Sequence, residues 1–140
     1  MRAGVTLIEL IVTITCGGIV AAIAVPHLTS ISDAAAVRDE TFRVVAALDA
    51  SRGAAVRLNS VTTLTLSSAA YRAVATVGAD SVVAWTDHGT RSGVALAGTG
   101  QPLLFGPAGL AMGVSNRTIT LTKGMALRRV VVSKLGRLTY

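Results

Sequence analysis

The stretch GVTLIELIVTITCGGIVAAIAV, residues 4–25, decides how the rest of the chain is interpreted. Its 21 residues from Val5 to Val25 are largely apolar, and Glu9 is the one charged residue among them. A helix of that length spans roughly 31 Å at about 1.5 Å per residue, close to the hydrocarbon thickness of a bilayer. No later run is comparably long and apolar. The sequence therefore predicts a single membrane-spanning helix, with the remainder of the 140 residues in water.

A cleavable secretory signal is the main alternative for this stretch. Such signals have an apolar core of about 7–15 residues, followed by a small-x-small cleavage site. The run here is longer, and Pro26-His27-Leu28 does not form such a site, so we expect the helix to be retained. Arg2 precedes the run. The positive-inside tendency then leaves the first residues in the cytoplasm and the bulk of the chain outside it.

Glu9 is out of place in a segment suited to lipid. A charge inside a spanning helix costs on the order of 2.5–3.5 kcal/mol at the bilayer centre, and such residues are usually paired and functional. The helix dipole already favours an anion near the N-terminus. A nearby positive partner would arise if cleavage after Gly4 exposed a new α-amino group at Val5. That amine on one subunit would pair with Glu9 of a neighbour and fix the axial offset between their helices.

The residues after Pro26 have the pattern of an amphipathic helix. Apolar residues recur at helical spacing among charged ones: Leu28, Ile31, Ala35, Phe42, Val45 and Val56. We expect one helix from about Thr6 to Leu58, kinked at Pro26 because proline removes a backbone donor.

From Val61 the sequence changes to short runs rich in Val, Thr and Leu, separated by turn residues. The predicted strands are 61–66, 71–77, 82–86, 93–97, 103–105, 118–122, 128–133 and 137–140. The fold class is therefore α+β: a long N-terminal helix, half transmembrane and half amphipathic, packed on a C-terminal antiparallel β-domain. The predicted organisation is a leader at 1–4, a transmembrane helix at 5–26, an amphipathic helix at 27–58 and a β-rich globular domain at 59–140.

The formal net charge of +6 is unevenly distributed. No acidic residue follows Asp87, whereas seven basic ones do. This asymmetry fits either an anionic partner, nucleic acid or an acidic protein surface, or a solvated basic surface without a ligand. The candidate residues for an anionic contact are Arg128, Arg129, Lys134 and Arg137.

No catalytic or metal-binding constellation is visible in the sequence, so we expect no enzyme activity, cofactor or metal. His27 and His88 are isolated, and Asp87-His88-Gly89 is expected to form a turn. Asp39 and Glu40 are predicted on a solvated helix face, and Trp85 and Phe105 in the β-domain core. Cys16 has no second cysteine to pair with and lies in the apolar run.

The stretch Gly4-Val5-Thr6-Leu7-Ile8-Glu9 closely resembles the prepilin processing motif of type IV pilins and type II secretion pseudopilins. The resemblance implies that a prepilin peptidase cuts between Gly4 and Val5 and methylates the amine of Val5. It also implies that Glu9 directs assembly. Pro26 falls where many family members have a helix-kinking proline. Val5 departs from the family's commonest residue, phenylalanine, but other apolar residues are tolerated there.

The C-terminal part resembles the GspH/FimT family of minor pseudopilins and minor pilins. The resemblance rests on LFGPAG (104–109), TITL (118–121) and RVVVSKLGRL (129–138). It implies a structural subunit of a type II secretion pseudopilus, with other pilin or pseudopilin subunits and secreted substrate as partners. The subunit would be anchored in the bacterial inner membrane by a single pass, with its globular domain in the periplasm.

The alternative is a FimT-like minor type IV pilin that binds DNA during natural transformation. The acid-free C-terminal part favours it, because phosphate contacts come from Lys and Arg. Family members linked to DNA binding carry a further arginine two positions after the Gly-Arg pair, where this chain has Thr139. The sequence leaves both functions open.

Overall fold

The computed structural model describes residues 4–113 and 116–140, omitting the side chain of Pro26. It divides into two compact units, Met1–Ser32 and Asp33–Tyr140. The helix α1 (Leu7–Arg57) belongs to both units, and its limits lie within one residue of the predicted ones. It remains helical through Pro26, and a kink at that residue stays a prediction.

The start of α1 is set by Thr6. Its hydroxyl accepts a hydrogen bond of 3.3 Å from the amide of Glu9, which is the N-cap geometry that satisfies one of the free amides of a first helical turn. Farther along, the hydroxyls of Thr13 and Thr15 donate to backbone carbonyls three or four residues earlier. These bonds satisfy polar groups inside an otherwise apolar helix without an outside partner.

All the described strands lie in the second unit. They are β1 (Val61–Leu66), β2 (Ala70–Val77), β3 (Asp80–His88), β4 (Ala95–Ala97), β5 (Leu103–Phe105), β6 (Ala111–Met112), β7 (Arg117–Lys123), β8 (Ala126–Val132) and β9 (Leu138–Thr139). The first sheet has the order β3-β2-β1-β5-β6 and the second the order β4-β7-β8-β9. Every strand pairing is antiparallel.

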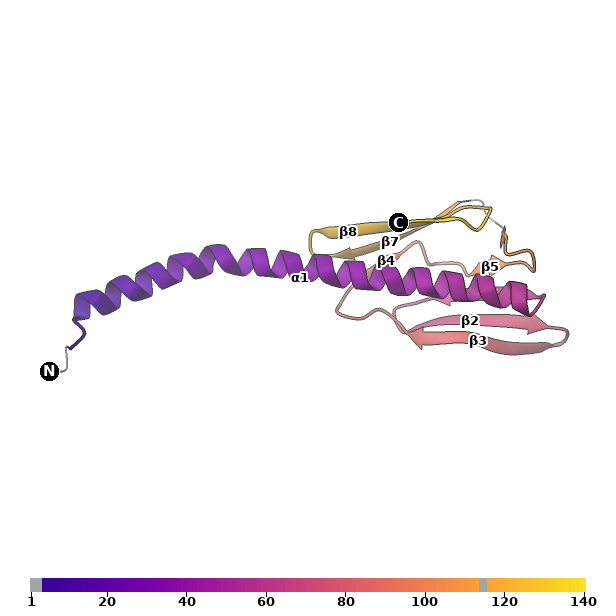
Figure 1. The fold of residues 1–140 in the computed structure, drawn as a ribbon, viewed down its shortest axis with the longest axis horizontal. Helices are drawn as coiled ribbons and strands as arrows, with labels where there is room; N and C mark the ends of the chain where they lie inside the picture. The colour runs from indigo at the N-terminus through magenta and orange to yellow at the C-terminus, as the bar shows by residue number, and fades with distance from the viewer. Residues whose placement is uncertain (1–3, 114–115) are drawn as a thin grey trace. The chain divides into compact units, whose positions relative to one another are not determined.

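The core of this unit lies between the two sheets and the part of α1 that begins at Asp33. Figure 1 shows β7 and β8 on one side of this helical segment and β2 and β3 on the other. The helix contributes small and branched side chains such as Val44, Ala47 and Leu48, and both sheets contribute alternate residues of their inner faces. Tyr71 and Phe105 are the largest fully buried side chains. The predicted α+β class is confirmed.

The structure corrects three details of the predicted β-domain. Ala111–Met112 forms a strand that the sequence did not indicate, paired with Leu104 and Phe105. Asp87 and His88 end β3 instead of forming a turn, because they pair with Tyr71 and Ala70 of β2. Trp85 is only partly buried against the core, whereas Phe105 is fully inside it as predicted.

Candidate functional site

The N-terminal part of α1 is apolar and its side chains are uncovered. An 18-residue window of the helix reaches a mean hydropathy of 2.3, and none of that window is buried within the molecule. Val5 is 73% exposed, and Leu7, Ile8 and Ile11 are also exposed. By length and composition this segment can cross a membrane, which would cover the side chains that the protein itself leaves bare.

Glu9 lies in the first turn of α1 and is exposed. Among the described residues, no basic side chain forms an ion pair with it. The amide that Thr6 caps is that of Glu9, so the two residues occupy the positions of a Thr-x-x-Glu capping signature. That spacing is a signal for the helix start that is present in the sequence itself. Gly4 and Val5, the predicted cleavage point, precede the helix, and Met1 to Ala3 lie outside the described residues.

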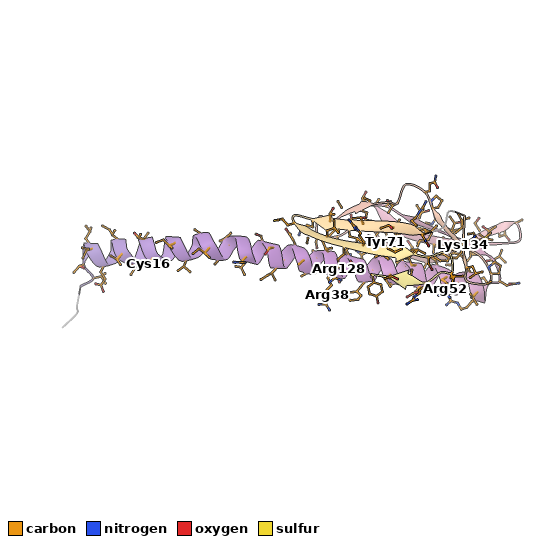
Figure 2. The ribbon with its side chains drawn as sticks, turned by 90° about the horizontal axis from the view of Figure 1, so that it is seen from above. Cys16, Arg38, Arg52, Tyr71, Arg128 and Lys134 are labelled. Carbon is orange, nitrogen blue, oxygen red and sulfur yellow. The ribbon has the colours of Figure 1, made fainter. Side chains whose placement is uncertain are left out.

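The basic residues proposed for an anionic contact do not gather in one place. In the register of β7 and β8, Arg128 is opposite the buried Leu121, whereas Arg129 is opposite Thr120. Since directly opposed residues share a face and neighbours alternate, Arg128 and Arg129 project from opposite faces of the second sheet. Lys134, in the following turn, lies well apart from Arg128 in Figure 2.

Arg137 closes that turn. Its amide donates a 3.0 Å hydrogen bond to the hydroxyl of Ser133, and its carbonyl accepts one from the amide of Ser133. The side chains of Lys134 and Arg137 are exposed. The four candidate residues are therefore distributed over two faces and a turn.

A buried ionic cluster joins α1 to the end of β3, and sequence reasoning missed it. Glu40 is 1% exposed and lies at its centre. Its carboxylate accepts hydrogen bonds from the Tyr71 hydroxyl, from Arg43 at 3.0 and 3.2 Å, and from the amide of Arg91 at 3.0 Å. The prediction of a solvated Glu40 was wrong, although Asp39 is exposed as expected. Helical spacing places Glu40 on the face of Val37 and Val44, which is the signal that would have shown it.

Arg43 extends this cluster to the β3 strand end. Its guanidinium donates to Asp87 Oδ2 at 2.7 and 3.1 Å and to the carbonyls of His88 and Gly89, and it lies 5.4 Å from the ring centre of Tyr71. Burial works to lower the pKa of Arg43, but the bond to Asp87 and the charges of Glu40 and Asp87 outweigh it and raise the pKa. The cluster is a structural clamp in which each charge has a partner.

The same charges shift the other titratable groups of the cluster. Burial, and then the hydrogen bond to Glu40, raises the pKa of Tyr71 far above its ordinary value. The phenol therefore stays protonated and remains a donor. The hydrogen bonds from Arg43 hold the pKa of Asp87 below its usual range. Asp87 is thus ionised wherever the protein is folded near neutral pH.

Two glycines of the C-terminal part meet at Arg52. Gly109 and Gly136 have φ of +72° and +74°, a region that side chains rarely adopt. A Cβ on Gly136 would lie 2.6 Å from the Gly109 carbonyl oxygen, and one on Gly109 would lie 3.2 Å from Arg52 Nε. Arg52 also donates to the carbonyl of Gly136 at 3.4 Å. The helix, the 106–110 turn and the 133–137 turn therefore converge where only glycine leaves room.

Comparisons with known proteins agree with this architecture. Residues 1–25 match the family model described as the prokaryotic N-terminal methylation motif, and residues 40–136 match that of the type II transport protein GspH. No curated protein matches the chain.

Two crystal structures of the type IV minor pilin FimU of Pseudomonas aeruginosa PAO1 are similar in fold. One, in space group P2₁, has 17% identity and a TM-score of 0.58, covering 81% of this chain and 91% of FimU. The other, in space group P6₅, has 16% identity and a TM-score of 0.56, covering 75% and 89%. At these identities the likeness concerns the fold.

The methylation motif and the apolar segment of α1 indicate a membrane-anchored, pilin-like subunit whose globular domain lies outside the cytoplasm. The predicted resemblance to minor pilins and pseudopilins is confirmed. The GspH match spans more than half of the sequence, and it shows that this chain belongs to the GspH family of type II transport proteins.

Proposed function

We propose that this chain is a minor pseudopilin of a type II secretion system, built into a periplasmic pseudopilus that supports protein secretion. The match of residues 40–136 to the GspH model carries this proposal. In this proposal, the apolar half of α1 holds the subunit in the inner membrane. Prepilin peptidase cuts the chain between Gly4 and Val5 and methylates the new amine of Val5.

Assembly in this proposal depends on Glu9. An uncompensated carboxylate in a lipid-facing helix is unfavourable, and the new amine of Val5 on a neighbouring subunit supplies the missing positive charge. The exposed position of Glu9 and its lack of an ion pair among the described residues support the pairing. In this proposal the role of the subunit is structural, and the charges of the buried cluster around Glu40 are engaged with each other in holding the fold.

The test is Glu9→Ala in the full chain, with secretion and filament incorporation as readouts. We expect normal membrane insertion and processing but loss of incorporation, with Glu9→Asp retaining part of it. Mass measurement of the mature N-terminus checks cleavage after Gly4 and methylation of Val5. Unchanged incorporation of Glu9→Ala would contradict the pairing.

DNA binding by a FimT-like minor pilin is the second candidate. The acid-free sequence after Asp87 favours it. The separation of Arg128, Arg129 and Lys134 over different surfaces favours the secretion role, because a phosphate backbone is held by several cations along one track. A mobility shift of duplex DNA by the full chain in detergent, measured at low and high salt, tests this candidate. Salt-sensitive binding would support it, and no binding at low salt would remove it.

A further inference from the structure

An open groove lies between the helix and the second sheet within the globular unit. Its volume is about 570 Å³, and it is lined by Ala34, Ala35, Arg38, Asp39, Phe42 and Arg128. Figure 2 shows Arg38 and Arg128 close to each other where the helix passes β8. The residues of the groove all belong to the unit that begins at Asp33.

The strand beside this groove has an open edge. β9 pairs only with Val131 and Val132, while β8 begins at Ala126. The outer edge of residues 126–130 therefore has no strand partner within the described part of the chain, although its inner edge pairs with β7 throughout. This edge is about 17 Å long, and alternate residues along it direct backbone donors and acceptors outward, where an extended segment can pair with them.

The charge at this edge is positive. Arg38 and Arg128 face the groove, and neither forms an ion pair among the described residues. Asp39 is the single carboxylate in the lining. The second sheet itself has no acidic residue, since none follows Asp87. An occupant with acidic side chains complements this surface, whereas the acid-free strands β4 to β9 of a second copy do not.

Two exposed aromatic side chains lie at this groove, Phe42 in its lining and Tyr140 in contact with Phe42. Phe42 is 49% exposed and Tyr140 is 59% exposed, and their rings meet edge to face at 6.4 Å between centroids. The guanidinium of Arg38 lies 5.7 Å from the centre of the Phe42 ring. Large aromatic side chains held in place next to arginines are typical of energetically important contacts in protein interfaces.

We propose that this groove binds an extended, acidic segment of another protein, which adds as a strand to the free edge of β8. An acidic side chain opposite Arg128 lies on the same face and reaches Arg38, and the backbone pairs with residues 126–130. Such a contact goes beyond the filament role proposed above and holds for either kind of filament. If the groove binds no acidic segment, the role of Glu9 in assembly is unaffected, so the two proposals can be tested separately.

The experiment titrates the full chain in detergent micelles with a fluorescent seven-residue peptide of alternating valine and glutamate. Fluorescence anisotropy measures binding, and a peptide with lysine in place of glutamate is the charge control. Arg128→Glu is compared with Arg129→Glu, which makes the same charge change on the opposite face of the same strand. We expect Arg128→Glu to weaken binding at least fivefold and Arg129→Glu to change it less than twofold.

Amide hydrogen exchange tests strand addition separately. With the glutamate peptide bound, edge-facing amides between Ala126 and Val130 should exchange at least threefold more slowly. Undetectable binding at millimolar peptide, equal effects of the two variants, equal binding of the lysine peptide, or unchanged exchange would each overturn the proposal. A dimer of the unliganded chain that Arg128→Glu dissociates would make a second copy the occupant and would overturn it too.

Discussion

Two glutamates of α1 stand in opposite situations. Glu40 is buried and accepts hydrogen bonds from Tyr71, Arg43 and the amide of Arg91. Glu9 is exposed on an apolar segment and has no ion pair among the described residues. The same type of side chain on the same helix thus has its hydrogen-bond and ion-pair partners inside the folded unit at position 40, and has no ion pair among the described residues at position 9.

The difference separates folding from assembly. A buried carboxylate whose partners come from three segments of one chain stabilises the fold of that chain, because removing it leaves the partners unpaired. A carboxylate with no ion-pair partner among the described residues of its chain contributes little to the folding of that part, and a neighbouring subunit can supply the partner. Glu40 therefore belongs to the fold, and we propose that Glu9 belongs to the filament.

The largest expected effect on folding is that of Glu40→Ala. It removes the acceptor of Tyr71 and Arg43 in a buried site, and we expect the free energy of unfolding to fall by about 3–5 kcal/mol. Urea unfolding of the full chain in detergent, followed through Trp85 fluorescence, measures this change. Glu9→Ala is the matched comparison and should alter the same quantity by less than about 0.5 kcal/mol. Equal losses for the two variants would end the distinction between the two glutamates.

Gly136→Ala should have the next largest effect. The left-handed conformation costs a side chain about 1–2 kcal/mol, and the new Cβ would also approach the Gly109 carbonyl oxygen to 2.6 Å. We expect a loss of about 2–3 kcal/mol in the same unfolding assay. Gly78→Ala has a similar φ of +63° but open space around the Cβ, so it isolates the conformational part and should lose about 1 kcal/mol.

The ionic cluster should also make the stability of the fold decrease in acid. Because Arg43 lowers the pKa of Asp87 in the folded state, the contribution of Asp87 is complete above its ordinary pKa of 3.8 and is lost as the pH falls through the lower, folded value. Asp87→Asn should therefore reduce stability at neutral pH and flatten its pH dependence below about pH 4. Unfolding midpoints from pH 7 to pH 2 measure this, with Asp80→Asn, an exposed carboxylate at the start of β3, as control. If Asp87→Asn loses stability in acid as steeply as the unsubstituted chain, Asp87 is not the source of this pH dependence.

The smallest effect is expected at the Asp33–Lys123 ion pair. Its atoms are 3.0 Å apart, and both side chains are about one quarter exposed. Pairs of this kind are worth about 0.2–1 kcal/mol and are screened by salt. Lys123→Ala should therefore lower the unfolding free energy by less than about 1 kcal/mol, and less again in 0.5 M salt. A loss as large as that of Glu40→Ala would show that this pair contributes to stability like a buried ion pair, which would contradict the prediction.

The sequence predicted the elements well where local pattern determines them. The strands Val61–Leu66 and Leu103–Phe105 have the predicted limits, and α1 is correct to within one residue at each end. Alternation of apolar residues and the turn glycines carry that information along the chain itself.

The errors fall where the structure depends on partners from other segments and not on the local sequence pattern. Glu40 looked solvated because its partners Tyr71 and Arg91 are 31 and 51 residues away. The β6 strand is two residues long and exists through its pairing with β5, so no local pattern marks it. Alternation along a strand already places the neighbours Arg128 and Arg129 on opposite faces, and the register with β7 adds that Arg128 lies on the face of the buried Leu121.

The packing of α1 against both sheets has a mechanical consequence. From Val37 to Ala55 its buried side chains lie along one long interface, with β2 on one side and β8 on the other, and with Arg52 held at the turns of Gly109 and Gly136. A force that pulls the helix along its axis loads these contacts in shear, all at once, instead of peeling them one after another. In the filament proposed above, a subunit built this way would resist having its helix drawn out of its own globular domain when the fibre is pushed or pulled.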